Sequence, residues 1–342
     1  MFAKLSVDKA LMKAKLHSKR GELDEAKKLY EAILNVFSKN KRAQKELDSL
    51  NNKNQVNEIL SPSKEIIDQL ISHYNYGNYL FVVEKAEPLT KQYPKSFMIW
   101  NILGVTSSVL GKKDIAVNSY KKCISANPNY PDAYSNMGLA LHDQSKFDEA
   151  IEVYKKAISL NPNYVEAYSN MGLTLKAQGK LDEAKQAYKK AISLNPNYAE
   201  AHSYIGNILK EQGKFNEAIY EYKKALSINP DYAEAYNNLG SALKDQGEFE
   251  EAIISYKKAL SINPNYVDSY YNMGNVLRHK GLLEEAIQSY QKAISLKLDF
   301  VDAYSNMGNV FKDQDKLEEA IEAYQKAISL NPNYAEAYSN MG

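Results

Sequence analysis

Amide side chains recur at one fixed spacing along most of this 342-residue sequence. An asparagine followed by Met-Gly or Leu-Gly returns every 34 residues, with one interruption at Tyr204. An amide offers both a hydrogen-bond donor and an acceptor, so a row of amides can pair with the N–H and C=O groups of an extended peptide, whatever its side chains. The row consists of Asn136, Asn170, Asn238, Asn272, Asn306 and Asn340.

Basic residues form a second row, six residues after the first one along the chain. These cations could form part of a ligand site, or they could belong to a solvated helix face, and both interpretations stay open. Acidic residues four positions before the asparagines, such as Asp132 and Asp268, favour the N-terminal turn of a helix. The basic row consists of Lys176, Lys210, Lys244, Arg278 and Lys312.

Both rows belong to a 34-residue repeat that extends well beyond them. Glycine recurs at position 8 of the repeat, alanine at position 20 and proline at position 32, where Leu298 is the exception. In this numbering the asparagines hold position 6 and the basic residues position 12. Position 1 is Phe97, Pro131, Val165, Ala199, Ala233, Val267 and Val301.

Each repeat predicts two helices. Apolar residues at positions 4, 7, 8 and 11 follow helical spacing, and a second such stripe begins at position 17. Glycine at position 15 of most repeats indicates the end of the first helix, and Asn-Pro at positions 31 and 32 indicates the end of the second. The small residues Gly138 and Ala150, at positions 8 and 20, would let the two helices approach closely.

The pattern Tyr/Trp-x-x-Met/Leu-Gly, then Ala-x-x-x-Tyr, then Pro resembles the tetratricopeptide repeat. The resemblance is close over residues 97–342, looser over 63–96, and extends to a divergent copy over 7–40 that keeps Gly21, Leu23, Ala26 and Tyr30. It implies an all-α fold, a right-handed superhelix (solenoid) of antiparallel helix pairs. It also implies that the first helix of each pair lines the concave surface.

We therefore expect an ordered succession of parts. A helical module over residues 1–50, with a helix over Lys41–Leu50, precedes a linker over 51–62 and a degenerate repeat over 63–96. Seven repeats follow over 97–334, and residues 335–342 begin a further one. The seven are 97–130, 131–164, 165–198, 199–232, 233–266, 267–300 and 301–334.

Two local departures from the pattern give expectations of their own. The array stops within a repeat, which would leave one face of the helix over Leu317–Leu330 open. We expect either that the sequence is a fragment, which we favour, or that this face associates with a second copy. Without a proline at Leu298, the helix over Leu283–Leu296 is predicted to run on, or the adjoining repeats to shift in angle.

The resemblance implies a scaffold that binds a protein or peptide ligand in the concave groove. The asparagine row is similar to that of O-linked N-acetylglucosamine transferases. An alternative is therefore a substrate-recruiting region of a larger enzyme, such as a glycosyltransferase, whose catalytic domain is absent from this sequence. The asparagines could instead bond to neighbouring helices, or persist as a relic of repeat duplication.

Composition and motifs argue against other functions. With 43 basic and 42 acidic residues the net charge is +1, which disfavours a nucleic-acid or anionic-membrane binder. The sequence has no nucleophile elbow, phosphate loop or HExxH motif, and the histidines lack metal-ligand spacing, so we expect no enzyme, cofactor or metal. His202 and Cys123 are predicted to pack in the core. One cysteine and no signal peptide or membrane span favour a cytoplasmic protein.

Overall fold

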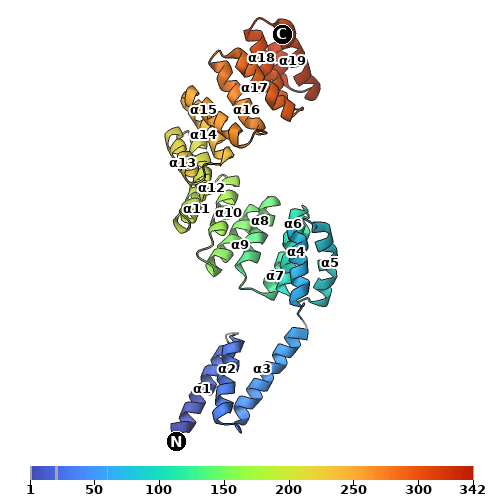
Figure 1. Ribbon diagram of the computed structural model, residues 1–342, viewed down its shortest axis with the longest axis vertical. Coiled ribbons are helices and arrows are strands. Elements are labelled where there is room, and N and C mark those ends of the chain that lie inside the picture. The colour runs from blue at the N-terminus through green and yellow to red at the C-terminus, as the bar shows by residue number, and fades with distance from the viewer. Residues whose placement is uncertain (1, 20–21, 60, 342) are drawn as a thin grey trace. The chain divides into compact units, whose positions relative to one another are not determined.

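The structure is a computed structural model that describes residues 2–19, 22–59 and 61–341. It divides into two compact bodies, the N-terminal body Met1–Gln144 and the C-terminal body Ser145–Gly342. Every regular element in the described residues is a helix (Figure 1). Within each body, helices pack against each other in hairpin pairs, such as α6 with α7 and α16 with α17. The predicted all-α fold of antiparallel helix pairs is confirmed.

The N-terminal body contains the helices α1 (Phe2–Lys19), α2 (Leu23–Val36), α3 (Lys41–Ile59), α4 (Lys64–Asn75), α5 (Tyr79–Gln92), α6 (Phe97–Val109), α7 (Lys113–Ala126) and α8 (Pro131–Asp143).

The C-terminal body contains the helices α9 (Phe147–Leu160), α10 (Val165–Ala177), α11 (Leu181–Leu194), α12 (Ala199–Glu211), α13 (Phe215–Ile228), α14 (Ala233–Gln246), α15 (Phe249–Ile262), α16 (Val267–His279), α17 (Leu283–Leu296), α18 (Val301–Asp313), α19 (Leu317–Leu330) and α20 (Ala335–Met341).

Helices α1–α3 pack around a small core of their own. Ala26 and Tyr30, at the alanine and tyrosine positions of the divergent repeat, are both buried in that core. Gly21, which the sequence places in the turn between α1 and α2, lies outside the described residues. The first part of the chain therefore contains one repeat-like helix pair with a third helix against it.

The third helix is longer than the sequence indicates. We expected a helix that ends at Leu50 and a linker over residues 51–62, but α3 continues to Ile59. The segment after Leu50 is polar, yet it contains neither glycine nor proline before Pro62, so no residue in it ends a helix early. Polarity alone was a poor signal for a linker.

Glycine at position 8 brings the two helices of a repeat together. A Cβ atom at Gly240 would lie 2.8 Å from Cε1 of Tyr256, and one at Gly274 would lie 2.7 Å from Cε1 of Tyr290. Both tyrosine side chains are fully buried, so neither ring can move aside. The predicted close approach at position 8 is confirmed in these repeats, whereas Gly342 lies outside the described residues.

Position 15 ends the first helix with a left-handed backbone conformation. Gly247 has a φ of 90° there, and the two repeats without glycine adopt the same conformation, with a φ of 59° at Ser145 and 58° at Asp315. A side chain in this region of φ carries a steric cost that glycine avoids. The turn geometry is therefore imposed by the packing of the helix pair and does not depend on glycine.

The repeat without proline shows no longer helix. α17 ends at Leu296, and Lys297 has a φ of −138° and a ψ of 93°, close to the values of −123° and 93° at its counterpart Asn263. The prediction that this helix runs on is wrong, because α17 ends at the usual place and with the usual turn geometry without a proline. One contact is lost, since Asn263 Oδ1 accepts a hydrogen bond from the N–H of Asn265 and Lys297 has no such acceptor.

Candidate functional site

The predicted asparagines lie on first helices and are half-buried. Asn136 belongs to α8 of the N-terminal body, and the other five belong to the C-terminal body, on α10, α14, α16, α18 and α20. In the C-terminal body the row is interrupted at α12, where Tyr204 takes the place of asparagine. The structure thus repeats an amide at one place of successive helix pairs.

Two of the asparagines bond to the preceding first helix. Asn272 Nδ2 donates to Asn237 Oδ1 at 3.2 Å. Asn306 Nδ2 donates to the hydroxyl of Tyr271 at 3.0 Å and to Asn275 Oδ1 at 2.9 Å. The interpretation that the asparagines hold neighbouring helices together, which the sequence left open, applies to these two.

Other asparagines keep their amide groups available. Within the described residues, the side chains of Asn136 and Asn170 make no hydrogen bond with the protein. Asn238 Oδ1 accepts only a long hydrogen bond of 3.5 Å from Asn237 Nδ2. The row therefore divides into amides that bond to the preceding repeat and amides whose hydrogen-bonding groups are largely unused within the described residues, with Asn170 and Asn238 in the second group.

The basic row is largely paired with acids. Lys176 Nζ lies 2.6 Å from Glu211 Oε1, Lys210 Nζ lies 3.6 Å from Asp245 Oδ2, and Arg278 Nε donates to Asp313 Oδ2 at 2.8 Å. In each case a cation at position 12 meets an acid at position 13 of the following repeat.

The remaining two cations have other partners. His279 replaces the acid in the repeat after Lys244, and the Nζ atom of this lysine lies 3.0 Å from Asp245 of its own helix. Lys312 Nζ donates to the backbone oxygen of Asn340 at 3.0 Å. The position 12 row thus serves contacts inside the protein, and a ligand carboxylate would have to compete for it.

The asparagines at position 9 accept hydrogen bonds from the buried tyrosines at position 24. Tyr222 donates to Asn207 Oδ1 at 2.7 Å, and Tyr290 donates to Asn275 Oδ1 at 2.8 Å. Where position 9 is not asparagine, the hydroxyls of Tyr188 and Tyr256 are buried and have no hydrogen-bond partner among the described residues. The tyrosines at position 24 are therefore packing residues, as their periodic placement predicts.

His202 is buried, as expected, but it takes part in a polar pair that the sequence analysis missed. Its Nδ1 lies 2.6 Å from Glu221 Oε2, and both side chains are largely shielded from solvent. His202 stands where most repeats have tyrosine, and Glu221 stands where the other repeats have a small residue such as Ala187 or Ser255. The two departures fall in one repeat, and that coincidence was the signal that could have revealed the pair.

The cysteine and the other histidines form no visible chemical site. Burial raises the pKa of the Cys123 thiol to about 12, so this side chain stays protonated at neutral pH. Within the described ranges, no group of three or more His, Cys, Asp or Glu side chains could hold a metal ion. In the same part of the chain, no helix combines the length and the apolar character that crossing a membrane requires.

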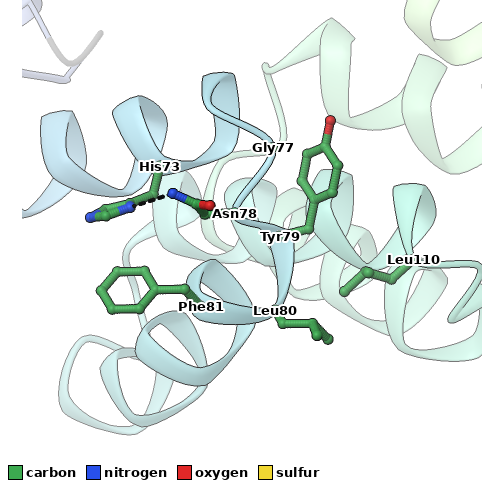
Figure 2. Close-up of a pocket in the computed structure, with 7 residues that line it drawn as sticks. All are labelled: His73, Gly77, Asn78, Tyr79, Leu80, Phe81 and Leu110. Carbon is green, nitrogen blue, oxygen red and sulfur yellow. Dashed lines mark hydrogen bonds between the residues drawn. The ribbon is translucent and has the colours of Figure 1, made fainter.

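A hollow of 580 Å³ lies beside the turn between α4 and α5 (Figure 2). His73 Nδ1 and Asn78 Nδ2 are 3.2 Å apart at one side of it, and the ring of His73 stacks on Phe81 with 4.2 Å between centroids. Leu80 and Leu110 contribute aliphatic surface. No residue of the asparagine or basic row lines this hollow, so it is separate from the predicted site.

The sequence matches a family model described as TPR repeat. The seven segments that match this model are residues 110–145, 138–179, 174–213, 206–247, 240–281, 274–315 and 308–342. No curated protein matches the sequence.

Several solved structures are similar to this chain. MamA is 32% identical over 48% of this chain and 97% of its own, with a TM-score of 0.45. YrrB, described as a TPR protein with an unusual peptide-binding site, is 25% identical over 55% of this chain and 97% of its own, with a TM-score of 0.47. The C-terminal part of a TPR repeat-containing protein from Cytophaga hutchinsonii is 18% identical over 72% of this chain and 100% of its own, with a TM-score of 0.57, and shares the fold.

Proposed function

Since the chain belongs to the tetratricopeptide repeat family, whose members are protein-interaction scaffolds, we propose that it binds an extended segment of a partner protein along its first helices. The fold is typically a non-catalytic scaffold, which agrees with the absence of catalytic motifs in the sequence. The observation that carries the proposal is the recurring half-buried amide at position 6, with Asn170 and Asn238 free to bond.

The amides suit a backbone better than a particular side chain. Asn170 and Asn238 each offer a donor and an acceptor, as does the peptide unit of an extended chain. Asparagine inside a helix costs about 0.5 kcal/mol relative to alanine, so local stability does not favour it. Asn272 and Asn306 have a structural reason to be asparagine, but Asn170 has none in the described contacts. A ligand supplies that reason.

The test separates binding amides from structural ones. A library of unbiased extended peptides is captured by the full chain and by a variant with Asn170→Ala and Asn238→Ala. We expect this variant to keep its helical circular dichroism and to lose peptides of many sequences. A matched control carries Asn163→Ala and Asn265→Ala in exposed turns between repeats. Equal capture by all three proteins would contradict the proposal.

Two finer expectations belong to the same proposal. The groove could recruit substrates for a catalytic domain, and the peptide test applies to that alternative unchanged. A cytoplasmic location is favoured by the single buried free cysteine, because disulfides are frequent only in oxidising compartments.

Self-association is a second candidate, supported by the surface of α19. Leu317 is 58% exposed and Ile321 is 41% exposed, whereas Ile253, at the position of Ile321 in an earlier repeat, is buried beneath the next helix pair. A second copy could cover this face. We expect light scattering to show a concentration-dependent dimer that Leu317→Glu with Ile321→Glu abolishes. A monomer at all concentrations would contradict this part.

A further inference from the structure

Helix α6 carries an apolar surface where the later first helices carry polar groups. Positions 2, 6, 9 and 13 form one stripe on a first helix. In α16 these positions are Asp268, Asn272, Asn275 and His279. In α6 they are all apolar, and two of them are well exposed, 42% for Met98 and 49% for Val109. The α6 stripe consists of Met98, Ile102, Val105 and Val109.

A cavity opens beside this stripe, between α4 and α6. Its volume is 240 Å³, below the range of about 300–1,000 Å³ that is usual for small-molecule sites. Ile71 and Tyr74 of α4 form one wall, and Met98, Ile102 and Val105 of the stripe form the opposite wall. Phe97 closes one end edge-to-face against Tyr130, with 5.2 Å between ring centroids. The lining contains no charged residue.

One residue that lines the cavity has a polar atom without a partner. Asn101 Oδ1 is buried and accepts no hydrogen bond within the described residues. Its counterpart Asn237 is fully engaged, because its Oδ1 accepts from Ser269 Oγ at 3.0 Å and from Asn272 at 3.2 Å. Ala133 stands where Ser269 stands and has no hydroxyl to donate. A buried acceptor without a donor is unfavourable, so a ligand N–H would be stabilised there.

We propose that this cavity binds one uncharged apolar side chain, of the size of leucine or phenylalanine, from an extended peptide, and that Asn101 accepts a hydrogen bond from the adjacent backbone N–H. The proposal rests on the proposed peptide-binding function and adds a sequence preference to it. The size limits the occupant to a single side chain. The uncharged lining excludes aspartate, glutamate, lysine and arginine, because their charges would lose water without gaining a partner.

The experiment uses labelled nonapeptides of glycine, serine and threonine with one central residue varied among leucine, phenylalanine, alanine, glutamate and lysine. Fluorescence anisotropy with the full chain measures each Kd. We expect leucine and phenylalanine peptides to bind at least tenfold more tightly than the alanine peptide, since burial of such a side chain accounts for a factor of about 10 or more. The glutamate and lysine peptides are expected to bind no better than alanine.

Variants locate the preference. Met98→Asp and Ile102→Asn install the residue types of later repeats and should remove the preference for leucine. Val109→Asp is the matched control, because Val109 belongs to the stripe but does not line the cavity, and it should retain the preference. Asn101→Ser should weaken the binding of the leucine and alanine peptides alike, about fivefold, so that the ratio of their Kd values stays the same. A purely structural Asn101 would change the melting temperature and no Kd.

The outcomes separate this inference from the proposed function. If the leucine and alanine peptides bind equally and the variant with Asn170→Ala and Asn238→Ala loses peptide binding, the cavity proposal is wrong and the proposal for the asparagine row stands. A leucine preference that Met98→Asp removes, together with normal binding by the asparagine variant, supports the cavity and overturns the row. A leucine preference that survives both Met98→Asp and Ile102→Asn places the apolar residue elsewhere and overturns the cavity. If no peptide binds, both proposals are wrong.

Discussion

Helices α6 and α16 hold the same place in their repeats, one in the N-terminal body and one in the C-terminal body. Their interior sides match, since a Cβ atom at Gly104 would lie 2.6 Å from Tyr120, and one at Gly274 would lie 2.7 Å from Tyr290. Their stripes at positions 2, 6, 9 and 13 are opposite in character, apolar in α6 and polar in α16. The comparison shows that packing fixes one side of a first helix and leaves the other side free to differ between repeats.

The two helices also differ in how they bind the neighbouring first helices. α16 donates from Asn272 to Asn237 of α14 and receives Asn306 of α18 at Tyr271 and Asn275. Its Arg278 is paired with Asp313. Asn101 of α6, at the position of Tyr271, has a buried oxygen without a partner in the described residues. Helix α16 therefore bonds to the neighbouring first helices through polar side chains, and in the described part of the chain α6 makes no such bond to α4 or α8.

High pH should have the largest effect, and it should affect both regions in the same direction. Burial raises the pKa of Tyr120 to about 12, and burial also raises the pKa of Tyr290. An unfolded tyrosine has a pKa of about 10, so folding favours the neutral form. This stabilisation is complete below about pH 10 and is lost as the pH rises through about 12. We expect helical circular dichroism and tyrosinate absorbance to change together in that range, and ionisation with the helices intact would contradict this.

Methyl groups at position 8 test whether the interior sides are truly equivalent. Gly104→Ala and Gly274→Ala should each lower the free energy of unfolding by about 1–3 kcal/mol, because the added Cβ meets a buried ring. Denaturant unfolding measures the loss. In a Tyr290→Leu background, Gly274→Ala should cost much less. Stabilisation by either alanine, up to the helix-propensity gain of about 1 kcal/mol, would show that the rings can move aside.

Asparagine substitutions test whether the asparagine row divides into amides that bond to the preceding helix and amides that do not. Asn306→Ala removes two hydrogen bonds to the preceding helix and should cost about 1–2 kcal/mol. Asn170→Ala removes none and should change the free energy of unfolding by less than about 0.5 kcal/mol. The two variants serve as controls for each other in thermal and denaturant unfolding. Equal costs would place Asn170 in a structural network.

The smallest effect is expected at the ion pairs that α6 lacks. Arg278→Gln should lower the free energy of unfolding by about 0.2–1 kcal/mol at low salt, because the pair with Asp313 is partly exposed. The difference should shrink at high salt, where screening weakens the pair. Denaturation of both proteins at two salt concentrations measures it. Ser108→Gln at the same position of α6, where Asp143 follows in the next repeat but position 12 carries no cation, is the control and should show no salt dependence.

Much of the fold followed from the 34-residue period. Residues equivalent to Gly274 and Tyr290 return in successive repeats. The close contact between their helices was predictable because position 8 packs against the tyrosine at position 24 of the same repeat. The end of α3 was not predictable from polarity, since a polar segment without proline or glycine can still be helical. The end of α17 shows the converse, because packing can end a helix without proline.

The candidate site was predictable only in part. Sequence spacing identified the amides, but the division between Asn170 and Asn306 depends on which residues of the preceding helix lie within bonding distance. Asn306 has a partner because the hydroxyl of Tyr271 in the preceding repeat lies within bonding distance, and the sequence of a single repeat does not show this contact. The sequence analysis did not identify the cavity beside α6, because Met98 and Ile102 precede the first asparagine of the row and belong to no periodic polar pattern.

The pairing of Arg278 with Asp313, and of Lys176 with Glu211, has a direction, from one repeat to the next. The repeat over 199–232 offers both, the cation Lys210 forward and the acid Glu211 backward. A gene duplication that inserts another copy of this repeat therefore brings both halves of the next pair with it and leaves no charge unmatched at either junction. The array can lengthen during evolution one repeat at a time, and the ladder of ion pairs lengthens with it.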